Sequence, residues 1–171
     1  DKAFIYTGKA QSWPEYDVIG LVGNDSIKAV VEGSIKFLGD TVPNEVKSYS
    51  FKTGTSDNSI VTTTDGQLTM TKASVAITIT AASEEWTYDG VAHHNTTVTL
   101  TSGNLLTDDY LEAQATGSVT NVADNAEGNN PIADGYKIMH GTQDVSANYV
   151  ITAVAGKLTI NPRPVTVTAQ D

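Results

Sequence analysis

The sequence predicts an all-β fold in which one small β-rich unit occurs twice. Threonine, valine and isoleucine supply 24, 17 and 11 of the 171 residues, against eight leucines. Side chains branched at Cβ suit strands better than helices. Short stretches also alternate between apolar and polar residues, and four sequence blocks recur in the same order. An apolar share of 39% is enough to build a core despite the net charge of −10.

The two copies are related by matched blocks whose offset grows along the chain. FIYTGKAQ from Phe4 matches WTYDGVAH from Trp86 at an offset of 82, and LVGNDSIKAVVEGS from Leu21 matches LLTDDYLEAQATGS from Leu105 at an offset of 84. YSFKTG matches YKIMHG at an offset of 87, and NSIVTTTDGQLTM matches NYVITAVAGKLTI at an offset of 90. The growing offset indicates loop insertions in the second copy.

This repeat predicts three segments along the chain. VAITIT at Val75 and VTVTAQ at Val165 share the offset of 90, so a third copy is expected to open near the end of the chain. The joints between copies are short, and the second contains two prolines, which favours a semi-rigid tandem arrangement of domains end to end. The predicted segments are two repeat domains at 1–71 and 72–160, and a linker with the first strand of a third repeat at 161–171.

Individual strands follow from the local pattern. Between Val75 and Thr80, valine and isoleucine alternate with alanine and threonine, which is the period of a half-buried strand. Apolar and β-branched segments elsewhere predict further strands at Ser48–Lys52, Asn95–Thr101, Leu111–Thr116 and Tyr136–His140.

A hairpin turn is expected near the end of each copy. Asp65-Gly66 lies between Ile60–Thr64 and Gln67–Thr71, and Asp-Gly supplies the positive φ that a tight hairpin needs. Ala155-Gly156 occupies the matching place in the second copy. Several short strands at regular spacing predict small β-sandwiches of the immunoglobulin-like kind. One buried helix against the sheet would instead make each copy a β-grasp-like α+β unit.

Three short motifs are shared by the copies: Y-[TD]-G-x-A, then G-S-[IV], then N-x-x-[IV]-x-x-x-x-G-x-L-T-[MI] before a strand that alternates Thr and Val. Their order resembles the YDG or MBG-type repeats of bacterial cell-surface and adhesin-like proteins. Copy one departs from the pattern with Thr7 for the usual Asp and with Ser59 where copy two has Tyr149. The resemblance implies extracellular tandem modules that form stalks or present binding surfaces, with no catalysis and no shared ligand.

Charge and hydropathy limit the partners. Acidic residues outnumber basic ones twenty to ten with no basic run, whereas nucleic-acid binding needs clustered Lys and Arg. No apolar stretch approaches the ~18–20 residues that span a bilayer, so we expect neither nucleic acid nor direct membrane insertion. The expected partners are neighbouring repeats of the same chain and host or cell-wall glycans or proteins. The expected location is extracellular, either secreted or attached to the cell wall or surface.

The main functional hypothesis is a stalk, spacer or adhesin repeat without catalytic activity. The sequence contains no G-x-S-x-G, H-E-x-x-H or G-x-x-x-x-G-K motif, and its three histidines offer few general bases. We therefore expect no enzyme activity, no catalytic residue and no cofactor.

Carbohydrate binding is the alternative function. Sugar-binding β modules expose aromatic rings that stack on sugar rings, beside polar groups that bind hydroxyls. Trp13 is a candidate because copy two has Asn95 at its place, so the shared core does not demand a tryptophan. The candidate ligand-binding residues are Trp13, Tyr16 and Asp17.

An oxygen-rich segment in copy two is a candidate for calcium binding. Residues 121–133, rich in Asn, Asp, Gly and Ala without periodicity, are expected to form a long exposed loop. Carboxylates and carbonyls are the ligands of calcium, and the candidates here are Asp124, Glu127 and Asp134. Their spacing matches no standard calcium loop, so a solvated acidic loop is the preferred interpretation and no metal site is assigned.

Overall fold

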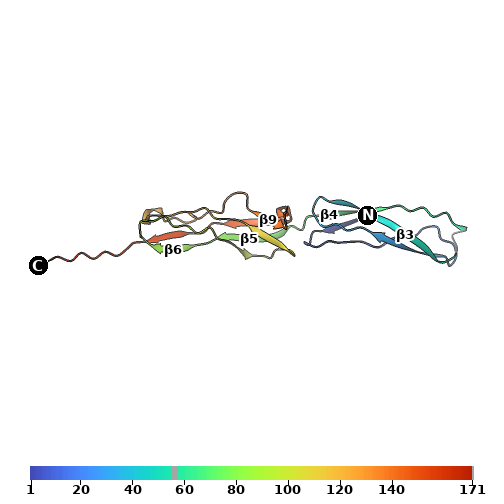
Figure 1. Cartoon of the computed structure of the whole chain (residues 1–171), viewed down its shortest axis with the longest axis horizontal. Helices are drawn as coiled ribbons and strands as arrows, with labels where there is room; N and C mark the ends of the chain where they lie inside the picture. The colour runs from blue at the N-terminus through green and yellow to red at the C-terminus, as the bar shows by residue number, and fades with distance from the viewer. Residues whose placement is uncertain (55–57, 171) are drawn as a thin grey trace. The chain divides into compact units, whose positions relative to one another are not determined.

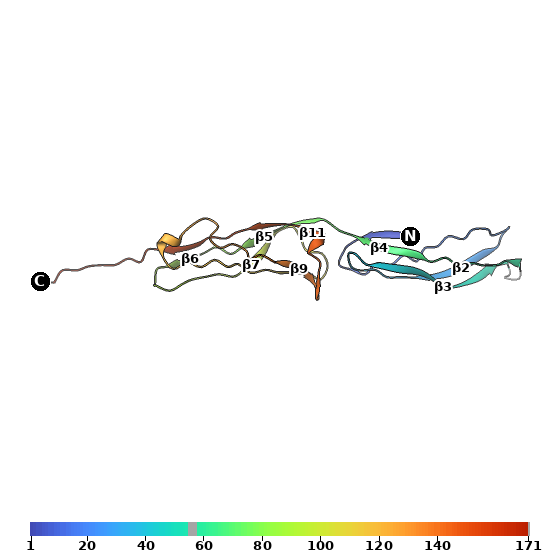
Figure 2. The same cartoon turned by 90° about the horizontal axis from the view of Figure 1, so that it is seen from above.

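The computed structural model describes residues 1–54 and 58–170, whose contacts divide the chain into two compact units, Asp1–Ala73 and Ser74–Asp171. We call them unit 1 and unit 2. Each is built from short strands (Figures 1 and 2), so the predicted all-β class is confirmed.

The described residues contain no α-helix. They include the 3-10 turns η2 (Val122–Asp124) and η3 (Ser146–Asn148), of three residues each. The β-grasp alternative is therefore wrong for the described part of the chain, because it needs a helix packed on the sheet. No helix in that part is long and apolar enough to cross a membrane.

Unit 1 contains one sheet of four strands in the order β1-β4-β3-β2. Its strands are β1 (Lys2–Ile5), β2 (Ser26–Glu32), β3 (Thr41–Thr53) and β4 (Gly66–Thr71). β1 runs parallel to β4, and β3 runs antiparallel to both β4 and β2. The buried apolar residues of this unit are Tyr6, Ile35, Leu68 and Met70.

Unit 2 contains three small sheets, in the orders β11-β5-β7, β12-β6 and β10-β9-β8. Its strands are β5 (Val75–Ala81), β6 (Glu84–Thr87), β7 (Val98–Ser102), β8 (Asp109–Glu112), β9 (Lys137–His140), β10 (Gln143–Asp144), β11 (Tyr149–Val154) and β12 (Leu158–Asn161). Val119, Leu158 and Ile160 form a buried cluster against which Trp86 packs.

The strand predicted from the VAITIT alternation is confirmed as β5. Ile77 and Ile79 are buried, whereas Ala76 before them is exposed and Thr78 between them is half-buried. β5 pairs in parallel with β11 along one edge and antiparallel with β7 along the other. Because both of its edges are paired, β5 is the central strand of its sheet.

Both predicted hairpins are wrong. Residues 60–65 belong to no ladder of the described chain, and β4 pairs instead with β1 and β3. In unit 2, β11 pairs with β5 while β12 pairs with β6, so the chain passes between two sheets at Gly156. Gly156 exchanges two backbone hydrogen bonds with Asn130, of 3.0 and 3.1 Å. A bridge to a distant segment therefore takes the place of a local turn.

Equivalent contacts occur in the two units at the offsets of the sequence match. They are the parallel pairs Lys2–Leu68 and Glu84–Leu158, the bridges Gln11–Ile35 and His93–Val119, and the side-chain caps Asp1–Gln67 and Ser83–Lys157. In the caps, a side-chain oxygen accepts a backbone N–H, at 2.8 Å in unit 1 and 2.9 Å in unit 2. The strand register of the one unit is thus repeated in the other.

The asparagine-rich segment 121–133 is held against β12 by its own side chains. Asn129 Oδ1 accepts the N–H of Leu158 at 2.7 Å, and its Nδ2 donates to the carbonyl of Leu158 at 2.9 Å. Asn125 makes the same two bonds with Ile160, at 2.8 and 3.0 Å. A carboxamide carries one donor group and one acceptor, like a peptide group, so these side chains replace a neighbouring strand. The expectation of an exposed loop is wrong for Asn125, Asn129 and the buried Asn130.

Residues 162–170, expected to be a linker and the first strand of a third repeat, form no ladder with other described residues. Val165 and Val167 are 82% and 92% exposed. Asp171, the last residue of that predicted strand, lies outside the described residues, as do residues 55–57 of the predicted domain 1–71.

We expect Asn129→Ala to lower the free energy of unfolding of unit 2 by about 1–3 kcal/mol, because it leaves the fully buried backbone of Leu158 without two partners. The exposed Asn104 provides a control, and Asn104→Ala should change stability by less than about 0.5 kcal/mol. Urea unfolding of both variants measures the difference. Equal losses would contradict a stabilising role for the carboxamide.

Candidate functional site

A groove on unit 1 brings together the three residues expected to bind a ligand. It has a volume of about 1000 Å³, and Trp13, Tyr16 and Asp17 all line it. None of the three is buried, with 37% and 39% of the residue surface exposed at Trp13 and Tyr16. The groove is therefore the candidate functional site.

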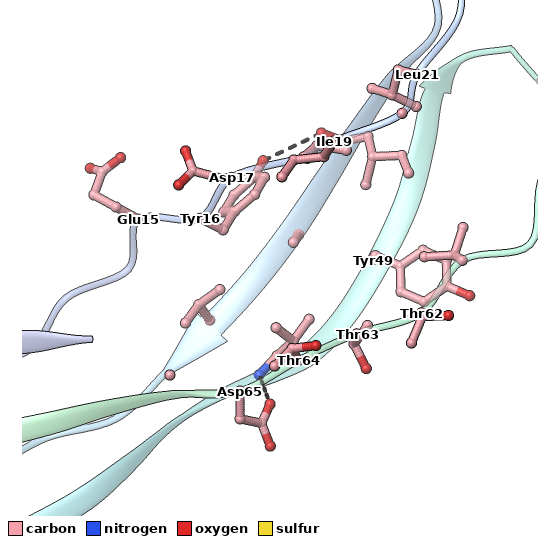
Figure 3. Close-up of a pocket in the computed structure, with 18 of the residues that line it drawn as sticks. Glu15, Tyr16, Asp17, Ile19, Leu21, Tyr49, Thr62, Thr63, Thr64 and Asp65 are labelled. Carbon is pink, nitrogen blue, oxygen red and sulfur yellow. Dashed lines mark hydrogen bonds between the residues drawn. The ribbon is translucent and has the colours of Figure 1, made fainter.

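The floor of the groove is the apolar face of strands β2 and β3. Alternation in β2, and a register shift between β2 and β3, place Ile27, Ala29 and Val31 of β2 and Val46, Tyr49 and Phe51 of β3 along it. Two extended segments, residues 15–21 and 59–64, border this floor (Figure 3). Neither segment belongs to a ladder of the described chain, and each carries an almost fully exposed isoleucine, Ile19 and Ile60.

Trp13 and Tyr16 form an aromatic border of the groove, and few hydrogen bonds hold them in place. The backbone carbonyl of Trp13 accepts Nδ2 of Asn44 at 2.8 Å, and the Tyr16 hydroxyl donates to the carbonyl of Ile27 at 3.4 Å. The ammonium of Lys2 lies 4.0 Å from the centre of the Trp13 ring. This cation–π contact covers part of the ring that a sugar would need for stacking.

The charge of the groove is negative. Its lining includes the acidic residues Asp1, Glu15, Asp17 and Asp65, and no Lys or Arg among the described residues lines it. Asp65 is engaged, since its Oδ1 accepts the N–H of Val46 at 2.9 Å. Such a lining suits neutral or polar ligands and disfavours anionic ones.

Strand β5 fills the corresponding space in unit 2. Its neighbours β7 and β11 match residues 16–20 and 59–64 of unit 1 at the offsets of 82 and 90. Ile138, which matches Phe51 of the groove floor, is fully buried in unit 2, whereas Phe51 is half-buried. The comparison of the two sequence copies did not identify the residues of the groove floor as part of a candidate site.

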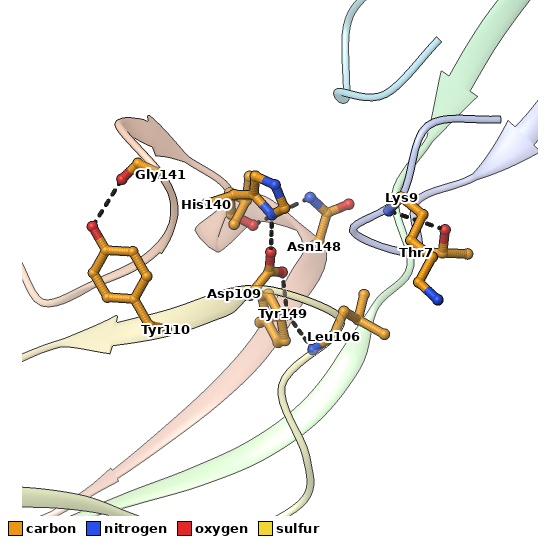
Figure 4. Close-up of polar contacts among 10 residues, drawn as sticks. Thr7, Lys9, Leu106, Asp109, Tyr110, His140, Gly141, Asn148 and Tyr149 are labelled. Carbon is orange, nitrogen blue, oxygen red and sulfur yellow. Dashed lines mark hydrogen bonds and ion pairs between the residues drawn. The ribbon is translucent and has the colours of Figure 1, made fainter. Parts of the chain in front are cut away.

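A buried polar cluster lies in unit 2 (Figure 4). The Asp109 carboxylate, whose side chain is 0% exposed, accepts the Tyr149 hydroxyl at 2.5 Å and pairs with Nδ1 of His140 at 2.7 Å. The Tyr149 oxygen in turn accepts the N–H of Leu106 at 2.9 Å. Burial, and then the bond to Asp109, raise the pKa of the Tyr149 phenol, so it stays a neutral donor. Ser59 occupies the position of Tyr149 in unit 1. The hydrogen-bonded connection between β8, β9 and β11 is therefore specific to unit 2.

The calcium candidates are engaged separately. Asp124 Oδ2 accepts the backbone N–H groups of Asn121 and Thr120, at 2.7 and 2.8 Å, whereas Glu127 pairs with Lys157. Asp134 is exposed. Within residues 1–54 and 58–170, no group of three or more His, Cys, Asp or Glu is placed to hold a metal ion.

Asp124 provides a test by pH. The N–H groups of Asn121 and Thr120 lower the pKa of its carboxyl, so the cap contributes stability above the ordinary pKa of about 3.9 and loses it as pH falls through the lowered folded value. Asp124→Asn should reduce the melting temperature at pH 7, and the deficit should vanish below about pH 3. Asp134→Asn is the matched control without effect. A calcium-dependent rise in melting temperature that Asp124→Asn abolishes would contradict a role as a cap alone.

Two matched glycines test whether the place of β5 is open in unit 1. A Cβ on Gly156 would overlap the carbonyl oxygen of Ala82 and lie 2.7 Å from that of Ala81. On Gly66, the nearest heavy atom would be the nitrogen of Asp1 at 3.5 Å. We expect Gly156→Ala to cost about 1–3 kcal/mol of unfolding free energy and Gly66→Ala to cost little. Calorimetry measures the unfolding free energy of both variants. Equal losses would indicate that the space next to Gly66 is filled as fully as the space next to Gly156.

Comparison of the chain with protein-family models, with curated proteins and with solved structures finds no match. A functional proposal for this chain therefore depends on its own residues.

Proposed function

We propose that the chain is a non-catalytic module of a bacterial cell-surface protein and acts as a stalk, spacer or adhesin repeat. In this proposal the two units are small β-sandwiches of the immunoglobulin-like kind, and their partners are neighbouring repeats and glycans or proteins of the host or cell wall. The module is extracellular, either secreted or attached to the wall.

Residues shared by the two copies serve the fold, and this observation supports a structural role. A Cβ on Gly33 or on Gly117 would lie 2.9 or 2.6 Å from the side-chain oxygen of Asn44 or Asn130, so both positions exclude a side chain for the same reason. The equivalent bridges and caps of the two units likewise join backbone segments. By contrast, the polar cluster at Asp109 and the aromatic border at Trp13 each belong to one unit. A repeated scaffold with variable surfaces is typical of modules that space or present other surfaces.

Carbohydrate binding is the second candidate, because Trp13, Tyr16 and Asp17 line one groove. An exposed ring next to a carboxylate offers stacking together with hydroxyl recognition. The position of Lys2 over the Trp13 ring opposes this function.

A glycan array separates the two candidates. For a structural module we expect no glycan hits from the unaltered chain. For a glycan-binding module, hits should disappear in Trp13→Ala and should strengthen in Lys2→Ala, which uncovers the ring. Hits that follow this pattern would replace the structural proposal.

Surface display is tested on intact cells. Antibodies raised against the chain should label unpermeabilised cells of the source organism or its culture medium, whereas antibodies against a cytoplasmic protein serve as the negative control. Labelling that requires permeabilisation would contradict the proposed location.

A further inference from the structure

The dipeptide Asp-Gly occurs in the sequence at Asp65-Gly66, Asp89-Gly90 and Asp134-Gly135. At such a pair the backbone nitrogen of the glycine can reach the side-chain carboxyl of the aspartate, because glycine has no side chain to hinder the approach. All three aspartates are exposed, so exposure does not distinguish them. Their hydrogen bonds do.

Asp65 and Gly66 are both held by the sheet of unit 1. Asp65 Oδ1 accepts the N–H of Val46 at 2.9 Å. Gly66 is the first residue of β4 and pairs with Asn44 of β3. Attack of the Gly66 nitrogen on this carboxyl would require the carboxylate to leave Val46 and the start of β4 to move.

Asp89 is held within its own turn. Its Oδ1 accepts the N–H of Val91 at 2.9 Å and lies 3.0 Å from Nε2 of His93. The bond from Val91, and then the bond from His93, lower the pKa of the Asp89 carboxyl. Ring closure needs the neutral acid, in which hydroxide is not the leaving group, so a lowered pKa also reduces the reactive fraction.

Asp134 and Gly135 have no such restraint. No hydrogen bond or ion pair joins the Asp134 carboxylate, or the Gly135 nitrogen, to another residue within the described part of the chain. Gly135 has a φ of +84°, and the space where a Cβ would stand is empty to 4 Å. The flanks of the turn are fixed, since Ala133 donates its N–H to the carbonyl of Gln114 at 2.8 Å and Ile138 donates to Ser146 Oγ at 2.9 Å. The turn can therefore rearrange while the strands beside it stay in place.

We propose that Asp134-Gly135 is a modification site at which Asp134 converts spontaneously to isoaspartate through a cyclic succinimide. The Gly135 nitrogen attacks Cγ of the protonated Asp134 carboxyl. The N–Cγ bond forms, and the amide proton and the carboxyl hydroxyl leave together as water. Water then adds to one of the two ring carbonyls. Opening at Cγ restores aspartate, whereas opening at the main-chain carbonyl gives isoaspartate. One water is released and one is taken up, so the mass does not change.

The product differs from the starting turn in two ways. The main chain runs through Cβ and Cγ of residue 134, which adds one atom to the turn before β9, and the carboxylate now stands on Cα. This carboxylate is the group to which isoaspartyl methyltransferases transfer a methyl group from S-adenosylmethionine. The site thus becomes an acceptor for this class of enzyme only after isomerisation.

The three Asp-Gly pairs test the proposal within one molecule. The full chain is aged at neutral pH, and peptide mapping with electron-transfer fragmentation measures isoaspartate at each pair. We expect isomerisation at Asp134 to be roughly two- to tenfold faster than at Asp65 or Asp89, the factor by which one backbone hydrogen bond retards release of a carboxylate. In guanidinium chloride the three rates should converge, because unfolding removes those bonds. Equal rates in the folded chain, or a faster rate at Asp65 or Asp89, overturn the proposal.

A variant supplies a second measurement. Asp134→Glu would require a larger ring and should remove most of the methyl groups that an isoaspartyl methyltransferase adds to the aged chain. Asp17→Glu is the matched control that keeps methylation, since Asp17 is exposed but is followed by valine. Methylation of aged Asp134→Glu equal to that of the unaltered chain overturns the proposal.

Discussion

One buried asparagine side chain joins the segments on which unit 2 depends. Asn130 exchanges backbone hydrogen bonds with Gly156, where the chain changes sheets. Its carboxamide donates to the carbonyls of Ala82, which follows β5, and of Asn95, and accepts the N–H of Gly117. These segments lie far apart in the sequence. A network of this kind is stabilising only when every member is satisfied, because the surrounding medium has a low dielectric constant. Glycine is required at Gly117 and Gly156 because a Cβ at either position would overlap atoms of this network or of the β5 end.

The need of buried polar groups for hydrogen-bond partners also separates the two units. Backbone groups of a strand need partners on both sides, and the molecule meets this need in several ways. β5 is paired by two strands, whereas the outer edge of β12 is paired by the carboxamides of Asn125 and Asn129. In unit 1, residues 16–20 and 59–64 border a groove and join no ladder of the described chain. The groove is thus a consequence of sheet pairing, and Trp13 lies at its border as a feature of unit 1 alone.

The local sequence pattern predicted secondary structure correctly where a strand can be recognised from its own residues. The alternation in Val75–Thr80 predicted β5, because each inward side chain is apolar and each outward one is small or polar. It failed where the partner is distant. Asp65-Gly66 has the composition of a hairpin turn, but the strands flanking the matching Gly156 belong to different sheets. Asn125 and Asn129 have the composition of a loop, and only the position of β12, some 30 residues later, gives them structural partners.

The sequence by itself determined that the chain is β-rich, that the same blocks of residues occur twice in the same order, and that Val165–Gln170 matches β5. These properties depend on the composition and order of residues, which are local. Only the tertiary structure decided that Trp13, Tyr16 and Asp17 share a groove, that its floor is the apolar face of β2 and β3, and that Asp124 caps a turn. Those outcomes depend on which strands lie next to each other, and pairing between distant segments is set by packing of the whole unit.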